Sequence, residues 1–360
     1  MLQPDNKTKT QIDKICRENP EIKLTIGVCD EKEKCVALFD QTGSKSNVNL
    51  VYEIGAITKV FTACLFAKLV TDGKMDIDDL ASDYISDLGK HGYYPSLRSL
   101  ATHSAGYHGA LPYGSKNSGV FGSLFRKKSR ADKAAHLLDF ESMLTLIEDN
   151  KVDGRRYPWV YSSFGYAILG YAVGVAAGND YKTAMDDFLL NELALKHSYT
   201  GIRSGVNIKG YNPKTKAMGN LDYEDSLMSP AGAISSTAED LLEFALENIH
   251  AEKPYLSLCH EKQVESKHLN MGLGWILPQR RSSVLFHNGS TDAFSSFIAI
   301  DTDKKVATVA LCNTACLLDE IGFNVFTNLQ RKYYTEEELK AEDELMNKEN
   351  EIPRRKGFLM

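Results

Sequence analysis

The sequence has no run of about 18 apolar residues, and residues 1–20 are polar, without the apolar stretch of a secretion signal. We therefore expect no membrane-spanning helix and a cytoplasmic location. The seven cysteines are odd in number and irregularly spaced, which is typical of reduced thiols rather than a disulfide framework. Cys312 and Cys316 form a lone pair without matching histidines or cysteines, so we expect no metal site there.

An excess of positive charge is also missing. The formal net charge is −6 and the pI is about 5.9, which argues against nucleic acid as a partner. Hydrophobic residues make up 43% of the chain and charged residues 25%, as in ordinary globular proteins. A length of 360 residues predicts about two domains, with enough core to fold without a metal or disulfide.

Periodicity predicts strands near both ends of the chain and helices between them. A helix over 5–18 precedes two strands over 23–29 and 35–39 and a short one over 51–54. A helix over 56–71 ends at Gly73, which is a plausible C-cap. The clearest later helices cover 142–148, 164–177 and 237–249, and the predicted later strands cover 272–277, 283–287, 295–300 and 306–311.

This order predicts an α/β (α+β) protein whose antiparallel sheet, flanked by helices, is built from both ends of the chain around an inserted all-helical domain. Residues 1–75 and 232–332 would form the sheet domain, and residues 76–231 the insertion. Two polar stretches, 113–132 and 205–224, are predicted surface loops. The tail, 333–360, begins with a capping box at Thr335-Glu-Glu-Glu338; it is either a solvated helix or a partner-binding segment.

Residues 52–62 read Tyr-Glu-Ile-Gly-Ala-Ile-Thr-Lys-Val-Phe-Thr. Lys59 follows Ala56 by almost one helical turn, so both lie on the same helix face. A buried lysine can lose its proton near neutral pH and act as a base. With a serine in place of Ala56, the two would form a nucleophile and base pair. Ala56 has no oxygen, and a methyl group cannot attack a carbonyl.

A second candidate is Tyr161, which comes before Ser162, Ser163 and an apolar helix. A tyrosine hydroxyl beside a lysine can relay protons. Taken alone, the segment fits equally a core tyrosine before a helix that a serine caps.

The third candidate is the polar segment His287-Asn288-Gly289-Ser290, which follows a predicted strand. Glycine lets a ligand approach the backbone closely. His287 can donate a hydrogen bond or carry charge toward a substrate carboxylate, although a lone histidine at a strand end also suits a structural role.

Together, and in this order, the three segments resemble the Ser-x-x-Lys, Tyr-x-Asn and Lys-Thr-Gly or His-x-Gly motifs of the serine β-lactamase and penicillin-binding-protein superfamily. The resemblance is to the branch of class C β-lactamases, D-alanyl-D-alanine carboxypeptidases, D-aminopeptidases and esterases. Further stretches of this chain resemble the same family: 73–79, 98–106, 230–241 and 272–275.

The resemblance implies roles. Position 56 would hold the nucleophile, Lys59 would be the proton acceptor or its electrostatic partner, and Tyr161 would be the proton shuttle to the leaving group. The backbone N–H groups of Ala56 and Ser290 would form the oxyanion hole. Ser163, His287, Asn288 and Gly289 would contact a small-molecule or peptide substrate, with no metal and no cofactor. His103 would be structural in this family.

Two departures matter for substrate choice. Ser163 stands where the family has asparagine, and His287 stands where class C β-lactamases have lysine. A serine hydroxyl is shorter than the asparagine amide and has a single donor, which argues against recognition of an acylamino group. The His-x-Gly form favours the peptidase and esterase branch over a penicillinase. The leading hypothesis is a serine hydrolase for an amide or ester of a peptide or acyl metabolite, inactivated at Ala56 by an engineered serine-to-alanine change. The alternatives are an acyltransferase or cyclase, and a native non-catalytic binder. The sequence sets no oligomeric state.

Overall fold

The computed structural model describes residues 4–46, 48–89, 94–107, 138–153, 155–212, 214–220, 226–266, 269–279, 281, 283–316 and 318–340. Within these ranges, nine strands form one antiparallel sheet in the order β3-β2-β1-β14-β13-β12-β11-β10-β9. Both ends of the chain therefore build the sheet, as predicted. Its strands are β1 (Leu24–Cys29), β2 (Lys34–Asp40), β3 (Gly43–Ser46), β9 (Val264–Glu265), β10 (Asn270–Met271), β11 (Ile276–Leu277), β12 (Val284–Ser290), β13 (Ser295–Asp301) and β14 (Val306–Cys312).

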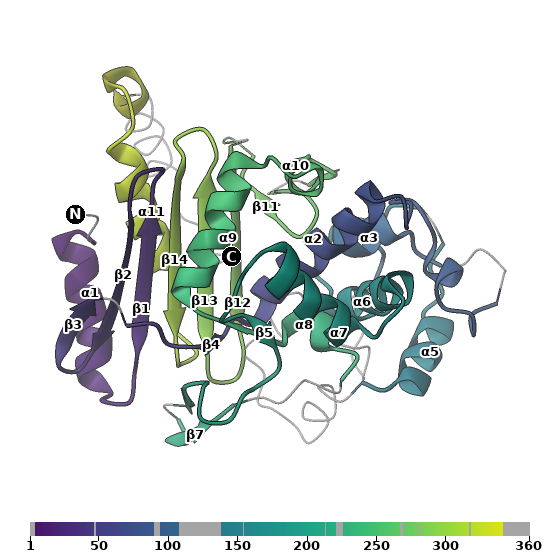
Figure 1. Ribbon diagram of the computed structural model, residues 1–360, viewed down its shortest axis with the longest axis horizontal. Coiled ribbons are helices and arrows are strands. Elements are labelled where there is room, and N and C mark those ends of the chain that lie inside the picture. Colours follow the sequence, from purple (N-terminus) through teal and green to yellow (C-terminus); the bar gives the residue numbers. More distant parts are fainter. Residues whose placement is uncertain are drawn as a thin grey trace.

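Two hydrophobic layers cover the two faces of this sheet. On β14, Ala307, Val309 and Leu311 belong to one layer, and the alternate residues Val306 and Ala310 to the other. The first layer contains α2 (Thr58–Thr71) and α9 (Ala238–His250), and α9 crosses the near face of the sheet in Figure 1. The second contains α1 (Asn6–Glu18) and α11 (Leu318–Arg331). Because both faces are covered, β13 and β14 are buried throughout.

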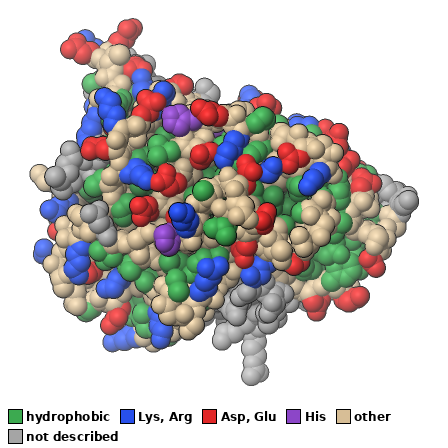
Figure 2. Space-filling view, in the orientation of Figure 1, with side chains coloured by type: hydrophobic (Ala, Val, Ile, Leu, Met, Phe, Trp, Pro, Cys, Tyr) green, Lys and Arg blue, Asp and Glu red, His purple; other side chains and the backbone are tan. Residues whose placement is uncertain are grey.

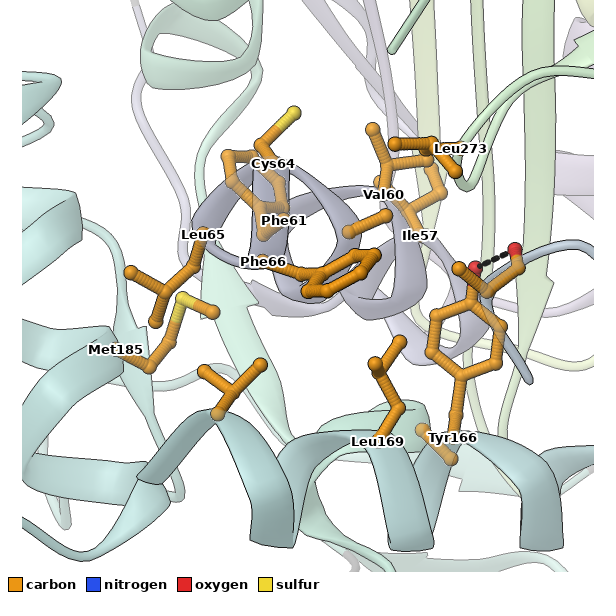
Figure 3. Packing of buried hydrophobic residues seen from close by; sticks show 14 of the residues in the cluster. Ile57, Val60, Phe61, Cys64, Leu65, Phe66, Tyr166, Leu169, Met185 and Leu273 are labelled. Atoms are coloured by element: carbon orange, nitrogen blue, oxygen red, sulfur yellow. Dashed lines mark hydrogen bonds between the residues drawn. The ribbon is translucent and has the colours of Figure 1, made fainter. Parts of the chain in front are cut away.

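A group of helices lies beside the sheet, on the right of Figure 1. Its members are α3 (Leu97–Ala101), α5 (Phe140–Asp149), α6 (Ser163–Ala177) and α7 (Tyr181–Asp187). Helix α2 lies between this group and the sheet, and the side chains of Leu169 and Tyr166 on α6 are directed at it (Figure 3). Such all-round burial explains why α2 carries apolar residues on every side rather than along one stripe. Four further short elements are η2 (Ala81–Asp83), η3 (Phe188–Glu192), α8 (Ser229–Gly232) and α10 (Pro254–His260).

The inserted segment is not all-helical. Within it, β5 (Tyr199–Thr200) joins β4 (Tyr52–Glu53) and β8 (Ile234–Ser236) in a small antiparallel sheet. β6 (Gly210–Asn212) pairs with β7 (Ala217–Gly219) inside the predicted loop over 205–224. The Asn212 carboxamide oxygen accepts the backbone N–H of Lys214 at 3.0 Å and so closes the turn between them. These strands are too short to give an alternating pattern in the sequence.

Two predicted strands have different bounds. The stretch 272–277 is a strand only at Ile276–Leu277, because Gly274 has φ +75° and turns the chain. β12 continues beyond His287 to Ser290, where a polar turn was expected, because Gly289 and Ser290 pair with Ser296 and Ser295 of β13.

The predicted capping box of the tail is confirmed. Thr335 N–H donates to Glu338 Oε2 at 2.7 Å, and Glu338 N–H donates to Thr335 Oγ1 at 3.2 Å. The rest of the predicted tail, 341–360, and the loop over 113–132 lie outside the described residues.

Among the helices of the described ranges, none combines the length and the apolar character needed to cross a membrane. On the face in Figure 2, basic and acidic side chains are interspersed rather than gathered by sign.

Candidate active site

Ala56 lies in a tight turn, η1 (Gly55–Ile57), that leads into α2. Gly55 has φ +50°, a conformation that side chains rarely adopt, so glycine allows the chain to turn here from β4 into the helix. The N–H of Ile54 donates to the Ile234 carbonyl at 3.0 Å, which fixes the turn to β8. Ala56 is partly exposed, whereas its neighbours Gly55 and Ile57 are buried. Position 56 is therefore the point at which this turn is open to solvent.

Lys59 is only 1% exposed and stands one turn further along α2. Its Nζ donates to the Ala231 carbonyl at 2.7 Å and lies 4.9 Å from the ring centre of Tyr161 and 5.7 Å from that of Tyr166. Burial penalises the charged form and lowers the pKa of Lys59 to about 7. The amine is therefore only partly protonated at neutral pH, as a general base must be.

The segment before α6 places Tyr161 against Lys59. Ser162 caps α6, its hydroxyl accepting the N–H of Gly165 at 3.0 Å. The Ser163 side chain hydrogen-bonds to Tyr161, while burial raises the pKa of the Tyr161 phenol. A phenol with a raised pKa keeps its proton, so Tyr161 is suited to donating a proton rather than to standing as a phenolate.

His287 and Asn288, adjacent on β12, point to opposite faces of the sheet. His287 is 1% exposed on the same face as Lys59, and its Nδ1 lies 2.6 Å from the Asn288 carbonyl oxygen. Because a carbonyl only accepts, that nitrogen carries the proton. Burial and then the nearby charge of Lys59 lower the pKa of His287 to about 4, so the ring is neutral at pH 7. The Asn288 amide nitrogen instead donates to Asp319 of α11 at 2.8 Å, on the face away from Lys59.

β12 touches the turn at Ala56 backbone to backbone. A β-carbon added to Gly289 would lie 2.2 Å from the Ile54 carbonyl oxygen and 2.9 Å from the Ala56 nitrogen. One added to Gly55 would lie 2.9 Å from the Ser290 nitrogen. Only glycine at both positions permits this approach. The structure thus brings together the two segments that carry the backbone N–H groups of Ala56 and Ser290.

Four further residues complete the group around Lys59, and sequence reasoning assigned them no role there. Ala231 accepts from Lys59, Tyr166 adds a second ring beside the ammonium, and Ser296 donates to the Ile54 carbonyl at 2.7 Å. The ring of His103, expected to be structural, packs 4.5 Å from that of Tyr161. The local sequence around these residues could not predict the contacts, because the contacting residues are distant in sequence.

The arrangement suits acyl transfer without a metal. A partly neutral amine lies one turn from position 56 and beside a protonated phenol, and the segments that carry the Ala56 and Ser290 amides are in contact. Amines, phenols and backbone amides are the groups that such a reaction uses to move protons and to hold an oxyanion. No cluster of three or more histidine, cysteine, aspartate or glutamate side chains suited to a metal occurs among the described residues.

Comparison with known proteins agrees with this geometry. The sequence model of the Beta-lactamase family matches residues 33–318. The chain belongs to this family. A β-lactamase of Providencia stuartii is 25% identical over 228 residues, which are 62% of this chain and 53% of that protein. A class C β-lactamase structure has a TM-score of 0.72 at 20% identity and covers 90% of this chain and 96% of its own. The octameric penicillin-binding protein homologue from Pyrococcus abyssi has a TM-score of 0.71 at 19% identity, covering 90% of this chain and 76% of its own.

These matches confirm the predicted resemblance to the serine β-lactamase and penicillin-binding-protein superfamily and the predicted sheet flanked by helices. At such low identities the solved structures establish the fold. The chain spans 53% and 60% of the lengths of two curated β-lactamases that it matches.

Proposed function

We propose that the chain is a serine-hydrolase scaffold for an amide or ester of a peptide or acyl metabolite, and that Ala56 prevents it from forming an acyl-enzyme. The observation that carries the proposal is the placement of Lys59. Its buried amine, with a pKa of about 7, stands one turn from the partly exposed position 56 and beside Tyr161. A lysine is costly to bury when its amine is held by a carbonyl rather than by a carboxylate, and a role as general base explains why this one is buried.

Nearby hydroxyls do not replace the absent serine. Thr58 Oγ1 is fully buried and accepts the N–H of Ile234 at 3.0 Å. Thr62 Oγ1, also fully buried, donates to the Pro230 carbonyl at 2.8 Å. Ser290 Oγ donates to the Thr291 carbonyl at 3.1 Å, on the face of β12 opposite His287. The two threonine hydroxyls are buried and bonded within the fold, and the Ser290 hydroxyl lies on the face away from His287, so we infer that this chain does not acylate.

We infer that Ala56 is an engineered replacement of a serine. Lys59, Tyr161, Gly55 and Gly289 keep an arrangement that serves a nucleophile at position 56, whereas a native binder has no need of a partly neutral lysine. The native binder is the alternative, and an acyltransferase or cyclase, in which an amine or alcohol replaces water, would use the same groups. The seven free thiols support a reducing compartment, so we place the protein in the cytoplasm.

The state of His287 bears on the substrate. A lysine at this position would offer a fixed positive charge to a carboxylate. His287 is neutral at pH 7, with Nδ1 donating to its own chain, so Nε2 is a hydrogen-bond acceptor. We therefore propose a substrate that has no free carboxylate at this point, such as an ester or a capped amide, rather than a penicillin.

The test is to place serine at position 56. Ala56→Ser protein is incubated with a fluorophosphonate probe, and the mass of the intact chain is measured. We expect one covalent adduct, located by digestion on the peptide that carries position 56, and none on the original chain. The labelling rate should fall by at least about 90% in Ala56→Ser/Lys59→Met, since a missing general base costs about 10²–10⁴-fold.

A folded Ala56→Ser protein that stays unlabelled would favour the native binder. Incubating the same protein with fractionated cell extract then separates hydrolysis from acyl transfer. A ligand that is only cleaved indicates a hydrolase, and one that is joined to an amine or alcohol indicates a transferase.

A further inference from the structure

Two cysteines lie close to each other where β14 ends and α11 begins. Cys312 is the last residue of β14 and is fully buried, whereas Cys316 is partly exposed and precedes α11 by two residues. Cys312 pairs with Ser295 of β13, so their side chains point to the same face with β-carbons about 4.5–5.5 Å apart. The Ser295 hydroxyl oxygen lies 3.8 Å from the Cys316 sulfur, and the Cys312 thiol hydrogen-bonds to that sulfur.

The loop between the two cysteines is held in place. The Cys316 N–H donates to Ser295 Oγ at 2.8 Å, and that hydroxyl donates to the Thr314 carbonyl at 2.6 Å. The Asn313 carbonyl accepts the N–H of Tyr211 at 2.6 Å. The chain is thus folded back over the start of β13, which keeps the two sulfurs together without a covalent bond.

The two thiols differ in reactivity. The hydrogen bond from Cys312 lowers the pKa of Cys316, against the opposing effects of burial and Asp319. The pKa of Cys312 is raised, because its thiol donates to Cys316 and is buried. Cys316 is therefore the more acidic and the more accessible of the two thiols, and the buried Cys312 thiol lies behind it. A partly exposed attacking thiol with a second thiol close to it is an arrangement suited to thiol–disulfide exchange.

We propose that Cys316 and Cys312 form a redox-active dithiol, which a low-molecular-weight disulfide such as oxidised glutathione converts into an intramolecular disulfide. Cys316 gives up its proton to solvent, attacks one sulfur of the reagent, breaks its S–S bond and releases the first thiolate. Cys312 then passes its proton to a thiolate, attacks the Cys316 sulfur and releases the second. The protein loses two electrons and two protons, and the reagent leaves as two thiols.

The disulfide formed in this way is a labile one. It closes a ring of only five residues, from Cys312 to Cys316, so it removes little entropy from the unfolded chain. A disulfide with little stabilisation is easily reduced, so an excess of thiol reverses the reaction. The pair lies on the face of the sheet opposite Lys59, and the inference does not depend on the function proposed above.

The chain supplies its own controls. The sulfurs of Cys64 on α2 and Cys259 on α10 are 3.7 Å apart, but both residues are fully buried. Cys35 on β2 is partly exposed, and no thiol of the described residues is hydrogen-bonded to it. Cys64 and Cys259 are therefore the control for two thiols that are close together but buried. Cys35 is the control for an accessible thiol without a neighbouring thiol.

The experiment exposes the folded, reduced chain to oxidised glutathione at pH 7, quenches with acid and digests with trypsin. Both cysteines lie in one peptide, 306–331, between Lys305 and Arg331. We expect this peptide to lose two hydrogen atoms and to regain them with excess dithiothreitol. Cys35 should keep a glutathione adduct, and Cys64 and Cys259 should react with iodoacetamide only after denaturation.

Two variants separate the roles. In Cys312→Ser, Cys316 should accumulate a stable glutathione adduct, and in Cys316→Ser, Cys312 should react at least about tenfold more slowly, since it is buried and protonated. The proposal is overturned if the unmutated chain keeps glutathione on Cys316. It is overturned equally if peptide 306–331 stays reduced while Cys35 is modified. Near-ultraviolet circular dichroism confirms that each variant is folded.

Discussion

The Nδ1 atom of His103 accepts a hydrogen bond from the backbone N–H of Ser162 over 3.1 Å. The carbonyl of the same histidine accepts from the N–H of Val160 at 2.9 Å. One residue thus binds the chain on both sides of Tyr161, and its ring also packs against the tyrosine ring. His103 does this from a left-handed conformation, φ +57°. We conclude that it fixes the position of the Tyr161 ring above Lys59.

Replacing His103 with alanine should therefore affect both stability and the site. The Ser162 N–H loses its acceptor in a buried position, which costs about 1–3 kcal/mol. We expect the free energy of unfolding in urea to fall by about that amount. In an Ala56→Ser background, the rate of fluorophosphonate labelling should also fall by at least about tenfold, because a misplaced proton donor loses most of its contribution of about 10²–10⁴-fold.

Another histidine, His260, provides the matched control. Its Nε2 is hydrogen-bonded to the Asn248 carboxamide at 2.9 Å, and burial lowers the pKa of His260 to about 4. His260→Ala should reduce the free energy of unfolding to a similar extent but leave the labelling rate of the Ala56→Ser protein unchanged. Equal loss of labelling in both variants would mean that His103 acts through stability alone.

The nucleophile helix was predictable because its signals are local. Lys59 follows Ala56 by almost one turn, and this spacing alone predicts that the two share a face. The strands β1, β2, β13 and β14 were predictable for a related reason, since they are short apolar runs with clear boundaries. Tyr161 required the resemblance to a family, because its own segment suits a capped helix in a core equally well.

Other features depend on pairs that are distant in sequence. The acceptor of Lys59 is the backbone carbonyl of Ala231. Every residue has such a carbonyl, so the sequence does not indicate which one accepts the hydrogen bond. The extension of β12 to Ser290 is stabilised by pairing with β13, which overrides the turn preference of Asn288 and Gly289. The motif predicted that Asn288 contacts the substrate. The same strand geometry instead directs its side chain toward Asp319.

The stability of the protein should rise with pH because of Lys59. Its pKa is about 7 when folded and 10.5 in the unfolded chain, so between these values the unfolded state binds more protons. Each pH unit in this window adds up to about 1.4 kcal/mol. We expect the free energy of unfolding to increase by about 2 kcal/mol from pH 7 to pH 9, and the increase to disappear in Lys59→Met.

Lys68 is the control on the same helix. It lies near the surface, and its ion pair with Asp72 at 2.8 Å raises its pKa. Lys68→Met should retain the increase between pH 7 and pH 9. If Lys59→Met retains it as well, the amine of Lys59 is charged in the folded protein throughout this range and cannot be the base.

The pH dependence of labelling provides a separate test of the base. In Ala56→Ser protein, the rate should rise through a pKa of about 7 as Lys59 loses its proton, and then level off. His287, with a pKa of about 4, does not change charge in this range. The measurement is the rate constant of labelling from pH 5.5 to pH 9 at fixed ionic strength, corrected for hydrolysis of the probe. A flat profile over this range excludes Lys59 as the base.

Gly289→Ala should disrupt the contact between β12 and the turn at position 56. The new methyl carbon would lie 2.2 Å from the Ile54 carbonyl oxygen and 2.4 Å from Ser296 Oγ, closer than atoms can approach. We expect the free energy of unfolding in urea to fall by about 3 kcal/mol, the upper range for an overfilled position. Labelling of the Ala56→Ser form should fall with it, because the strand must move away from Ala56. Gly219→Ala, where an added methyl meets nothing within 4 Å, should change neither quantity. A Gly289→Ala protein with unchanged stability and labelling would mean that β12 does not contact the turn.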